Sequence, residues 1–431
     1  MSVVILGAGL AGLSAAHHLK SELRILEKDA EPGGLCRSRY GAGFTFDHGP
    51  HLFFGKDAYY RRLVRRFVAP GLHARRADAG QHSFGVTVPF PYAVHLRGMP
   101  TDVVVRCVRD YVRARASLDD AAPADYRAWC EKHFGAGFAA LFMSPYARKI
   151  WTVEPEALST DWVSVRIVTP PVEDVIEGAV AERRIDATYI GDFLYPKRRG
   201  AQALVDGFTR RTPAVETERE IVELSHRRRA VTLADGETVR YERLVSTIPL
   251  PVLIARMTDA PRGIREAAAR LVHTSVVTVN LGVDRADLSP YQWLYFDDPA
   301  VPFYRVSFPH RLAPANAPRG CGSLSAEISF SKHRALPKGD LVARVRKSLE
   351  AVGVLRRGDA VLHAEAVTLP FAYVLFDHAR RAAVGGILPW LESRGIHPIG
   401  RFGRWDYLWT HDVILDGRRV AERIDRDLGA R

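Results

Sequence analysis

The sequence is poor in cysteine and in motifs that bind metals. Its 431 residues include four cysteines, at positions 36, 107, 130 and 321, without the C-x-x-C spacing of redox or zinc sites. The 16 histidines form no H-E-x-x-H or comparable ligand pair, so we predict no bound metal. No disulfide framework is indicated, and this favours a cytoplasmic protein.

Long apolar runs and low-complexity segments are missing as well. No uncharged apolar stretch approaches the ~20 residues of a membrane-spanning helix, so we expect no integral membrane segment. The apolar start lacks the basic leader and small-residue cleavage pattern of a signal peptide. We find no internal repeat and no linker of biased composition. The length predicts two or three globular domains.

Acidic residues are outnumbered, with 49 Asp and Glu against 61 Lys and Arg and a formal net charge of +12. The basic residues occur as short scattered clusters, such as 75–76, 183–184, 197–199 and 227–229. There is no long basic tail and no recognisable nucleic-acid motif, so we expect no nucleic acid partner. The positive field favours small anionic ligands, phosphorylated substrates in particular.

Glycine is concentrated at one informative place near the N-terminus. After two residues the chain reads V-V-I-L-G-A-G-L-A-G, an apolar strand followed directly by Gly7, Gly9 and Gly12. These glycines permit a tight turn, a close backbone approach to a pyrophosphate, and packing of a helix on the strand, respectively. Glu27 ends the next apolar strand and can accept two hydrogen bonds from a ribose diol. The pattern predicts a dinucleotide bound at a helix N-terminus.

A second glycine pair follows soon after that acid. Gly33 and Gly34, in E-P-G-G-L-C-R-S, provide another close backbone approach, which suits a cofactor that extends past its pyrophosphate. This favours FAD over NAD. Cys36 either packs in the core or lies near the flavin. The residues that we expect to contact FAD from this part of the chain are Gly7, Gly9, Leu10, Ala11, Gly12, Glu27, Lys28, Gly33, Gly34, Leu35 and Cys36. We also expect a contact from Val222, much later in the chain.

Periodicity divides the remainder into helical and sheet-forming parts. Helical spacing extends from about 101 to 176, and a run of strands follows later in the chain. The predicted helices cover 13–19, 103–116, 126–142, 200–211 and about 413–428. The predicted strands cover 221–224, a hairpin turning at Asp235-Gly236, 244–249, 276–281, 293–296, 303–308, 323–328 and 396–402.

We therefore predict an α/β fold with a Rossmann-like FAD-binding domain assembled from discontinuous segments. An inserted helical domain and an antiparallel β-sheet substrate domain complete the prediction. The FAD-binding domain comprises residues 1–75, 195–265 and 385–431, the helical domain 96–190, and the sheet domain 76–95 and 266–384.

Taken together, these segments resemble the flavin amine oxidase and protoporphyrinogen oxidase superfamily. That likeness rests on the glycine fingerprint, Gly33-Gly34, and residues 195–208 and 400–403. Shorter stretches are similar to the UDP-galactopyranose mutases, in their eukaryote-like branch. The sequence G-P-H-L-F-F is similar to the mutase loop that places a histidine against the flavin ring, which implies Gly49 and His51 at the cofactor.

The helical stretch S-P-Y-A-R-K-I-W is similar to the mutase helix whose tryptophan packs near the uridine. The resemblance implies Trp151 as a substrate-binding residue, although a helical tryptophan is more often part of a core. Ala147 stands where the eukaryote-like mutases have an asparagine, so the nucleobase stays open. A mobile loop of the mutases carries a second diphosphate arginine, for which Arg184 is the candidate beside a solvated surface charge.

Three further stretches carry the resemblance. In F-Y-R-V-S-F-P the resemblance implies that Arg305 grips the diphosphate of the substrate, although an arginine on an edge strand is the alternative. In G-R-F-G-R-W-D-Y-L-W it places Gly400 and Arg401 by the flavin and makes Tyr407 a hydroxyl donor to the diphosphate and a cofactor contact. Tyr373, in A-Y-V-L-F-D, resembles the tyrosine above the reactive flavin face.

The resemblance implies a FAD-dependent nucleotide-sugar mutase, a flavin-dependent isomerase. The reaction would be a pyranose–furanose ring contraction of UDP-galactopyranose or a related nucleotide sugar through an N5 adduct of reduced flavin. NAD(P)H is a candidate reductant, and the resemblance is compatible with a homo-oligomer. The alternative is a FAD-dependent oxidase or desaturase. The implied catalytic residues are His51, Arg305, Tyr373, Arg401 and Tyr407, and the implied substrate-binding residues are Trp151, Arg184, Arg305, Tyr373 and Tyr407.

Overall fold

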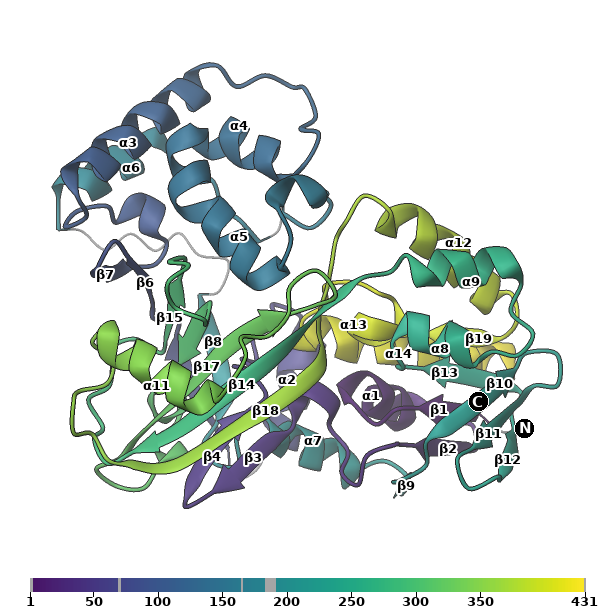
Figure 1. The fold of residues 1–431 in the computed structure, drawn as a ribbon. Coiled ribbons are helices and arrows are strands. Elements are labelled where there is room, and N and C mark those ends of the chain that lie inside the picture. The colour runs from purple at the N-terminus through teal and green to yellow at the C-terminus, as the bar shows by residue number, and fades with distance from the viewer. Residues whose placement is uncertain (1–2, 69–70, 164–165, 183–190, 430–431) are drawn as a thin grey trace.

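The computed structural model describes residues 3–68, 71–163, 166–182 and 191–429 of the chain. Two large sheets organise these residues, one parallel and one mainly antiparallel, and a group of helices lies above the second sheet in Figure 1. Within the described ranges, no helix is long and apolar enough to cross a membrane.

The parallel sheet has the strand order β19-β13-β1-β2-β9, and every pairing in it is parallel. Its strands come from the beginning, the middle and the end of the chain: β1 (Val3–Leu6), β2 (Leu23–Leu26), β9 (Val215–Glu216), β13 (Arg243–Ser246) and β19 (Ile396–Pro398). The predicted Rossmann-like sheet assembled from discontinuous segments is confirmed. The domain boundaries given above stay a prediction.

Helix α1 (Leu10–His18) starts three residues earlier than predicted, directly after Gly9. Gly7 has a φ of +93°, and a Cβ on Gly12 would lie 2.0 Å from the carbonyl oxygen of Gly7. The first turn is therefore as tight as the fingerprint predicts. Helix α14 (Thr410–Asp427) packs on the same helix, because a Cβ on Gly417 would lie 2.6 Å from the carbonyl oxygen of Ala11.

The predicted strand over 396–402 is wrong beyond Pro398. The chain turns there into the short helix α13 (Gly400–Gly403), with Gly400 at a φ of +73°. The Gly400 N–H donates to the carboxylate of Asp416 at 2.8 Å. A glycine in this left-handed conformation ends an extended strand and lets the chain turn towards α1.

The second sheet has seven strands in the order β18-β14-β17-β16-β15-β6-β7, and only β15 and β6 pair in parallel among them. The four strands predicted over 276–328 are present. The longest strand, β18, was not predicted, because its less exposed positions include His363 and Glu365, its exposed positions include Leu362, and it contains Pro370. It lies at the sheet edge, where proline is tolerated. The strands are β6 (Ala79–Ser83), β7 (Val86–Pro89), β14 (His273–Val283), β15 (Trp293–Phe296), β16 (Arg305–Ser307), β17 (Gly322–Phe330) and β18 (Val361–Val374).

The helical segment predicted from about 101 to 176 is present in the described residues. The stretch predicted as one helix over 126–142 is interrupted at Gly135, with a φ of +78°, where a Cβ would lie 2.3 Å from the carbonyl oxygen of Asp110. The interruption, together with Gly137, lets α4 pack closely against the backbone of α3. The helices are α3 (Thr101–Ala116), α4 (Tyr126–Phe138), the π-helical η3 (Ala139–Met143), α5 (Ser144–Trp151) and α6 (Val172–Val180).

The other elements complete the two sheet regions, including the predicted hairpin that turns at Gly236 between β11 and β12. They are η1 (Gly34–Cys36), β3 (Ser38–Gly41), β4 (Phe44–Asp47), α2 (Ala58–Phe67), β5 (Leu72–Arg76), η2 (Tyr92–Val94), η4 (Pro155–Ala157), β8 (Asp192–Pro196), α7 (Gln202–Thr209), β10 (Ile221–Ser225), β11 (Ala230–Leu233), β12 (Thr238–Arg240), α8 (Leu250–Arg256), α9 (Arg262–Ala269), α10 (Pro309–Leu312), η5 (Pro314–Asn316), α11 (Leu341–Ala351) and α12 (Arg380–Glu392).

Two glycine-to-alanine changes inside helices should have opposite effects. Gly12→Ala places a methyl group against the Gly7 carbonyl, and we expect a loss of about 1–3 kcal/mol in unfolding free energy. Gly385→Ala, in α12, meets no atom within 4 Å, so better helix propensity should add about 0.5–1 kcal/mol. Urea unfolding of both variants checks the signs. A neutral or stabilising Gly12→Ala would contradict the tight turn.

Candidate active site

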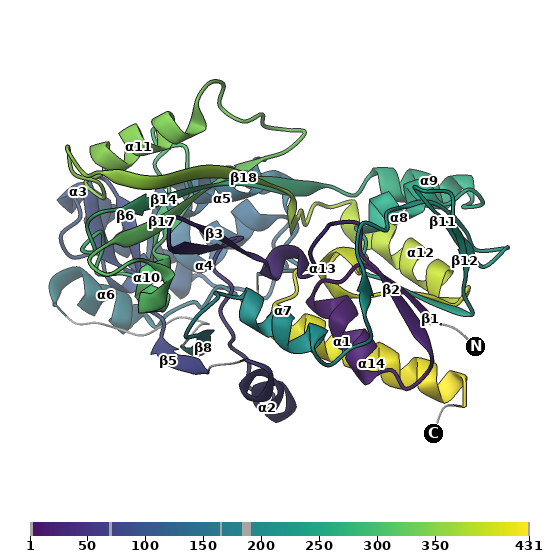
Figure 2. The same ribbon diagram turned by 90° about the horizontal axis from the view of Figure 1, so that it is seen from below.

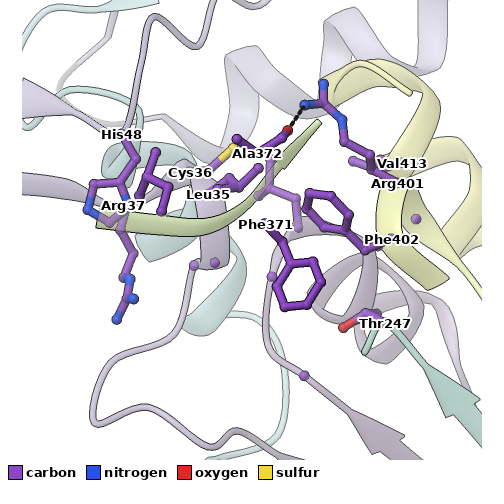
Figure 3. Close-up of a pocket in the computed structure, with 18 of the residues that line it drawn as sticks. Leu35, Cys36, Arg37, His48, Thr247, Phe371, Ala372, Arg401, Phe402 and Val413 are labelled. Atoms are coloured by element: carbon purple, nitrogen blue, oxygen red, sulfur yellow. Dashed lines mark hydrogen bonds between the residues drawn. The ribbon is translucent and has the colours of Figure 1, made fainter. Parts of the chain in front are cut away.

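A cavity of about 810 Å³ lies between the two large sheets. Gly7, Gly9 and Glu27 line one end, and Arg305 and Tyr373 line the other. Its walls come from the carboxyl ends of parallel strands, where open α/β sheets bind ligands, and from the antiparallel sheet. Figure 3 shows part of the wall, with Phe371 and Phe402 beside Thr247.

The end at Glu27 forms a cradle of backbone. A Cβ on Gly34 would lie 3.4 Å from the Cα of Gly9, and Gly33 donates its N–H to the carbonyl of Ala8 at 2.8 Å. Glu27 is buried, and its carboxylate accepts the N–H of Ala8 at 2.7 Å and that of Asp29 at 3.0 Å. The glycines thus leave space where side chains would otherwise stand, beside a fixed carboxylate. This arrangement fits the adenosine and pyrophosphate of FAD.

Most of the expected FAD contacts line this cavity. Gly12 does not, because it lies within α1, where it packs against the turn. Val222 has a half-exposed side chain, while its neighbours Glu220 and Ile221 are on the cavity wall. The expected residues found on the wall are Gly7, Gly9, Leu10, Ala11, Glu27, Lys28, Gly33, Gly34, Leu35, Cys36, Gly49, His51, Gly400, Arg401 and Tyr407.

His51 is held in one orientation by a hydrogen bond from its Nδ1 to the carbonyl of Gly49, at 2.9 Å. Burial, followed by the positive charge of Arg401, lowers the pKa of His51 to about 3. The ring is therefore neutral at physiological pH, and Nε2 carries the lone pair. Burial raises the pKa of the Cys36 thiol to about 12, so Cys36 is protonated and is not a nucleophile.

The Arg401 side chain lies in the cavity wall, and its hydrogen bonds to the described residues all go to main-chain oxygens. Its Nε and Nη2 donate to the carbonyl of Leu408 at 2.9 and 2.7 Å, and its Nη1 donates to Ala372 at 3.2 Å (Figure 3). Its guanidinium lies 5.2 Å from the ring centre of Tyr407. In the described part of the chain, no carboxylate lies within ion-pair distance of this arginine. A partly buried cation without a counter-ion favours an anionic ligand.

Arg305 forms a two-point ion pair with Glu327, a residue that the sequence analysis missed. Arg305 Nε and Nη2 donate to the two carboxylate oxygens at 2.7 and 2.8 Å, and Tyr304 also donates its hydroxyl to this carboxylate. Glu327 is directly opposite Arg305 in the strand register and is 3% exposed. Nε and Nη2 of Arg305 are therefore bonded to Glu327. Nη1 makes no hydrogen bond to the described residues and can donate to a ligand. An acidic residue at an inward position of β17 was the available signal.

Tyr373 and Tyr407 form an aromatic wall beside Arg305. Their ring centres are 5.7 Å apart in an edge-to-face arrangement, and the Tyr373 hydroxyl lies 3.4 Å from Arg305 Nη2. Trp151 packs edge-on against both tyrosines, at 5.7 and 6.0 Å, and is 4% exposed. It is absent from the cavity wall, so it braces the tyrosines from the side of the protein.

Three aromatic or basic residues near this end were not singled out by the sequence. Trp293 and Tyr295, on β15, line the cavity. Arg166 stacks on Tyr407, with its guanidinium carbon 4.1 Å from the ring centre, and donates to the carbonyls of Trp162 and Tyr407. Arg184 lies outside the described residues. No group of three or more potential metal ligands occurs among the described residues.

Comparison with known proteins defines the class. Residues 10–424 match the family described as flavin containing amine oxidoreductase, so the chain belongs to that family, which implies FAD as the cofactor. A crystal structure of reduced UDP-galactopyranose mutase is similar over 100% of this chain and 94% of that one, with a TM-score of 0.93 and 26% identity. The predicted resemblance to the mutase fold within this superfamily is thus confirmed.

Other similarities are more distant or local. A putative protoporphyrinogen oxidase from Exiguobacterium sp. 255-15 shares the fold, with a TM-score of 0.74 and 17% identity over 99% of both chains. Phytoene dehydrogenase of Streptomyces griseus is 37% identical over 93 residues, 18% of each chain. Coproporphyrinogen III oxidase of Staphylococcus aureus is 26% identical over 128 residues, 27% of this chain and 28% of that one. The chain thus spans less than a third of these curated relatives.

The lowered pKa of His51 predicts an acid-dependent stability. Below the ordinary histidine pKa of about 6.5, the unfolded chain binds a proton that the folded protein does not accept until about pH 3. The contribution of His51 to the free energy of unfolding is therefore fully present above about pH 6.5. It decreases as the pH is lowered, by up to about 1.4 kcal/mol per pH unit.

His51→Gln should remove this contribution. We expect the urea midpoint of the variant to fall less than that of the parent between about pH 7 and about pH 5, at equal FAD content. His333→Gln, at an exposed position, is the matched control and should behave as the parent. Parallel pH profiles for parent and His51→Gln would show that His51 is not kept neutral by the fold.

Proposed function

We propose that the chain is a FAD-dependent nucleotide-sugar mutase that interconverts pyranose and furanose rings, with UDP-galactopyranose or a related nucleotide sugar as substrate. The observation that carries the proposal is the guanidinium of Arg305, held in place by Glu327 beside Tyr373 and Tyr407 at the aromatic end of the cavity. A fixed guanidinium beside two tyrosine side chains suits a diphosphate ester. The whole-chain similarity to reduced UDP-galactopyranose mutase supports the same assignment.

The residues of the backbone cradle would hold the cofactor, with Glu27 at the adenosine ribose, the Gly7–Gly9 turn at the pyrophosphate, and His51 and Arg401 at the flavin ring. Reduced FAD, when bound, supplies the nucleophile for the anomeric carbon, so no side-chain nucleophile is required. We propose that the reduced form is the active one, with NAD(P)H as a candidate reductant.

The side chains at the aromatic end would bind and orient the leaving diphosphate. Glu327 fixes the plane of the Arg305 guanidinium at the cavity wall. The Tyr407 hydroxyl is a neutral donor, because burial raises its pKa to about 12. Charge that develops on the diphosphate would thus meet donors that need no reorganisation. Tyr373, bonded to Arg305, would close the sugar position, with Trp151 bracing it.

For the second diphosphate arginine we propose Arg166. Its guanidinium lies on the ring of Tyr407 and 4.7 Å from the ring centre of Trp409, two residues of the cavity wall. The positive charge of Arg166 therefore lies beside the Tyr407 ring at the aromatic end of the cavity. Arg184 stays a prediction from the resemblance.

The second candidate function is a FAD-dependent oxidase or desaturase. The observation that favours it is the local sequence similarity to phytoene dehydrogenase, 37% identity over 93 residues. Hydride removal from an apolar substrate would make no use of Arg305. Oxygen or acceptor consumption during turnover separates the candidates, since ring contraction is redox-neutral.

Arg305→Met alone would confuse binding with folding, because it leaves the Glu327 carboxylate buried without a cation. We expect this single variant to lose about 3–5 kcal/mol of stability. The double variant Arg305→Met/Glu327→Gln should recover most of that loss and bind FAD normally. Its kcat/KM for ring contraction of UDP-galactopyranose, with dithionite-reduced enzyme and product separated by chromatography, should fall about 100-fold or more. A stable double variant with parental turnover would refute the proposal.

Arg166→Ala should raise the KM for the nucleotide sugar about tenfold or more, with FAD content unchanged, because a diphosphate contact is lost. Arg381→Ala, which removes an exposed arginine near the same region, is the matched control and should leave KM unchanged. Steady-state kinetics of both reduced enzymes check this. An unchanged KM in Arg166→Ala would show that Arg166 is not the second arginine that binds the diphosphate.

A further inference from the structure

Basic clusters that are scattered in the sequence meet on one outer face of the molecule. Helix α2 has a buried apolar face, and its four arginines are on the opposite side, all exposed. Figure 2 shows α2 at an outer edge of the molecule, with β5, β8 and α7 beside it. The members of what we name the basic face are Arg61, Arg62, Arg65 and Arg66 on α2, Lys197 and Arg198 after β8, and Arg210 and Arg211 after α7.

Direct contacts hold these segments together. The Arg211 guanidinium stacks 4.6 Å from the ring centre of Phe67, at the end of α2. The Lys197 N–H donates to the carbonyl of Gly71 at 2.9 Å. Helix α7 also packs directly on α2, because a Cβ on Gly207 would lie 2.4 Å from the carbonyl oxygen of Phe67. The ends of α2 and α7 therefore lie together, and Figure 2 shows β8 beside them.

The charges of the basic face are uncompensated. In the part of the chain that the structure describes, none of its members is within ion-pair distance of a carboxylate, whereas most other arginines on surface helices are paired, such as Arg127 with Glu156 and Arg262 with Glu266. Helix α2 contains no acidic residue, its N-cap Asp57 accepts the main-chain N–H of Tyr60, and Asp206 of α7 is paired with Arg199. Uncompensated like charges at close range repel one another, so a polyanionic partner would relieve that repulsion.

We propose that the basic face binds the surface of an anionic phospholipid bilayer, reversibly and without insertion. The four exposed arginines of α2 lie on the side of the helix opposite its buried residues Tyr60, Leu63, Val64 and Phe67, so they are presented together to a partner surface. The apolar side of this helix is already used in the core, which leaves electrostatic attraction as the binding force. Polybasic clusters of this size bind acidic lipids in this way.

The same face suits a polynucleotide less well. Single-stranded nucleic acids are bound by basic grooves with exposed aromatic rings on which bases stack. The basic face itself contains only arginine and lysine. Two rings beside it are already covered: Tyr59 on α2 by the guanidinium of Arg418, 4.2 Å from the ring centre, and Tyr40 by that of Arg199, 5.4 Å from the ring centre. Lipid phosphates and carboxylates are bound by charge and need no aromatic ring for stacking.

Co-sedimentation of the FAD-loaded protein with vesicles tests the proposal. The parent should bind vesicles of phosphatidylcholine with about 30 mol% phosphatidylserine and not vesicles of phosphatidylcholine alone. Binding should be lost between about 50 and about 300 mM NaCl, because salt screens exposed charges. Arg61→Gln/Arg62→Gln/Arg65→Gln/Arg66→Gln should weaken binding about tenfold or more. Lys197→Gln/Arg198→Gln, a second and milder variant, should weaken it less.

The matched control removes the same number of arginines from ion pairs elsewhere. Arg127→Gln/Arg148→Gln/Arg262→Gln/Arg346→Gln should bind vesicles within a factor of about two of the parent, although its net charge equals that of the α2 variant. FAD absorbance and thermal midpoint confirm folding for each variant. Equal losses in control and α2 variant, no binding by the parent, or stronger binding of duplex DNA at equal phosphate concentration would each overturn the proposal.

Discussion

The close approach of backbone to backbone around the first turn is the constraint on which the rest of the structure depends. Gly12 lies against the carbonyl of Gly7, and Gly417 on α14 lies against that of Ala11. A Cβ on Gly403 would lie 2.6 Å from the carbonyl of Ser246, at the end of β13. Segments from the beginning, middle and end of the chain thus converge where side chains are missing. The cavity begins at this point, and its far end is set by how the second sheet is attached to it.

Charged side chains define the far end of the cavity, whereas glycines define the near end. Arg305 is paired along one edge with Glu327, whereas the hydrogen bonds of Arg401 to the described residues all go to carbonyl oxygens. The two arginines therefore differ: Arg305 is held in place by a carboxylate, while Arg401 has no carboxylate partner among the described residues. Burial of a cation without a counter-ion is unfavourable, and binding of an anion offsets this cost. The site is in this sense built for a negatively charged ligand.

Local sequence was enough for features whose cause is local. The glycine turn, Glu27, the hairpin at Gly236 and the apolar strands of the second sheet could be predicted because a few neighbouring residues determine each of them. Glu327 could not, since its importance comes from the register that sets it opposite Arg305. The break at Gly135 also depends on a neighbour, the carbonyl of Asp110 on the crossing helix. Strand β18 and the turn after Pro398 were missed for the same reason, because position in the sheet overrides the local pattern.

The position of Trp151 has a thermodynamic consequence. This side chain belongs to the helical insert, yet its edge supports the rings of both Tyr373 and Tyr407. The carbonyls at the end of α5 are in turn bound by Arg334, from the connection after β17, through hydrogen bonds to Arg148 and Lys149. The insert and the ligand site thus share one coupling free energy, so whatever shifts the insert changes ligand affinity, and ligand binding must tighten the insert by the same amount.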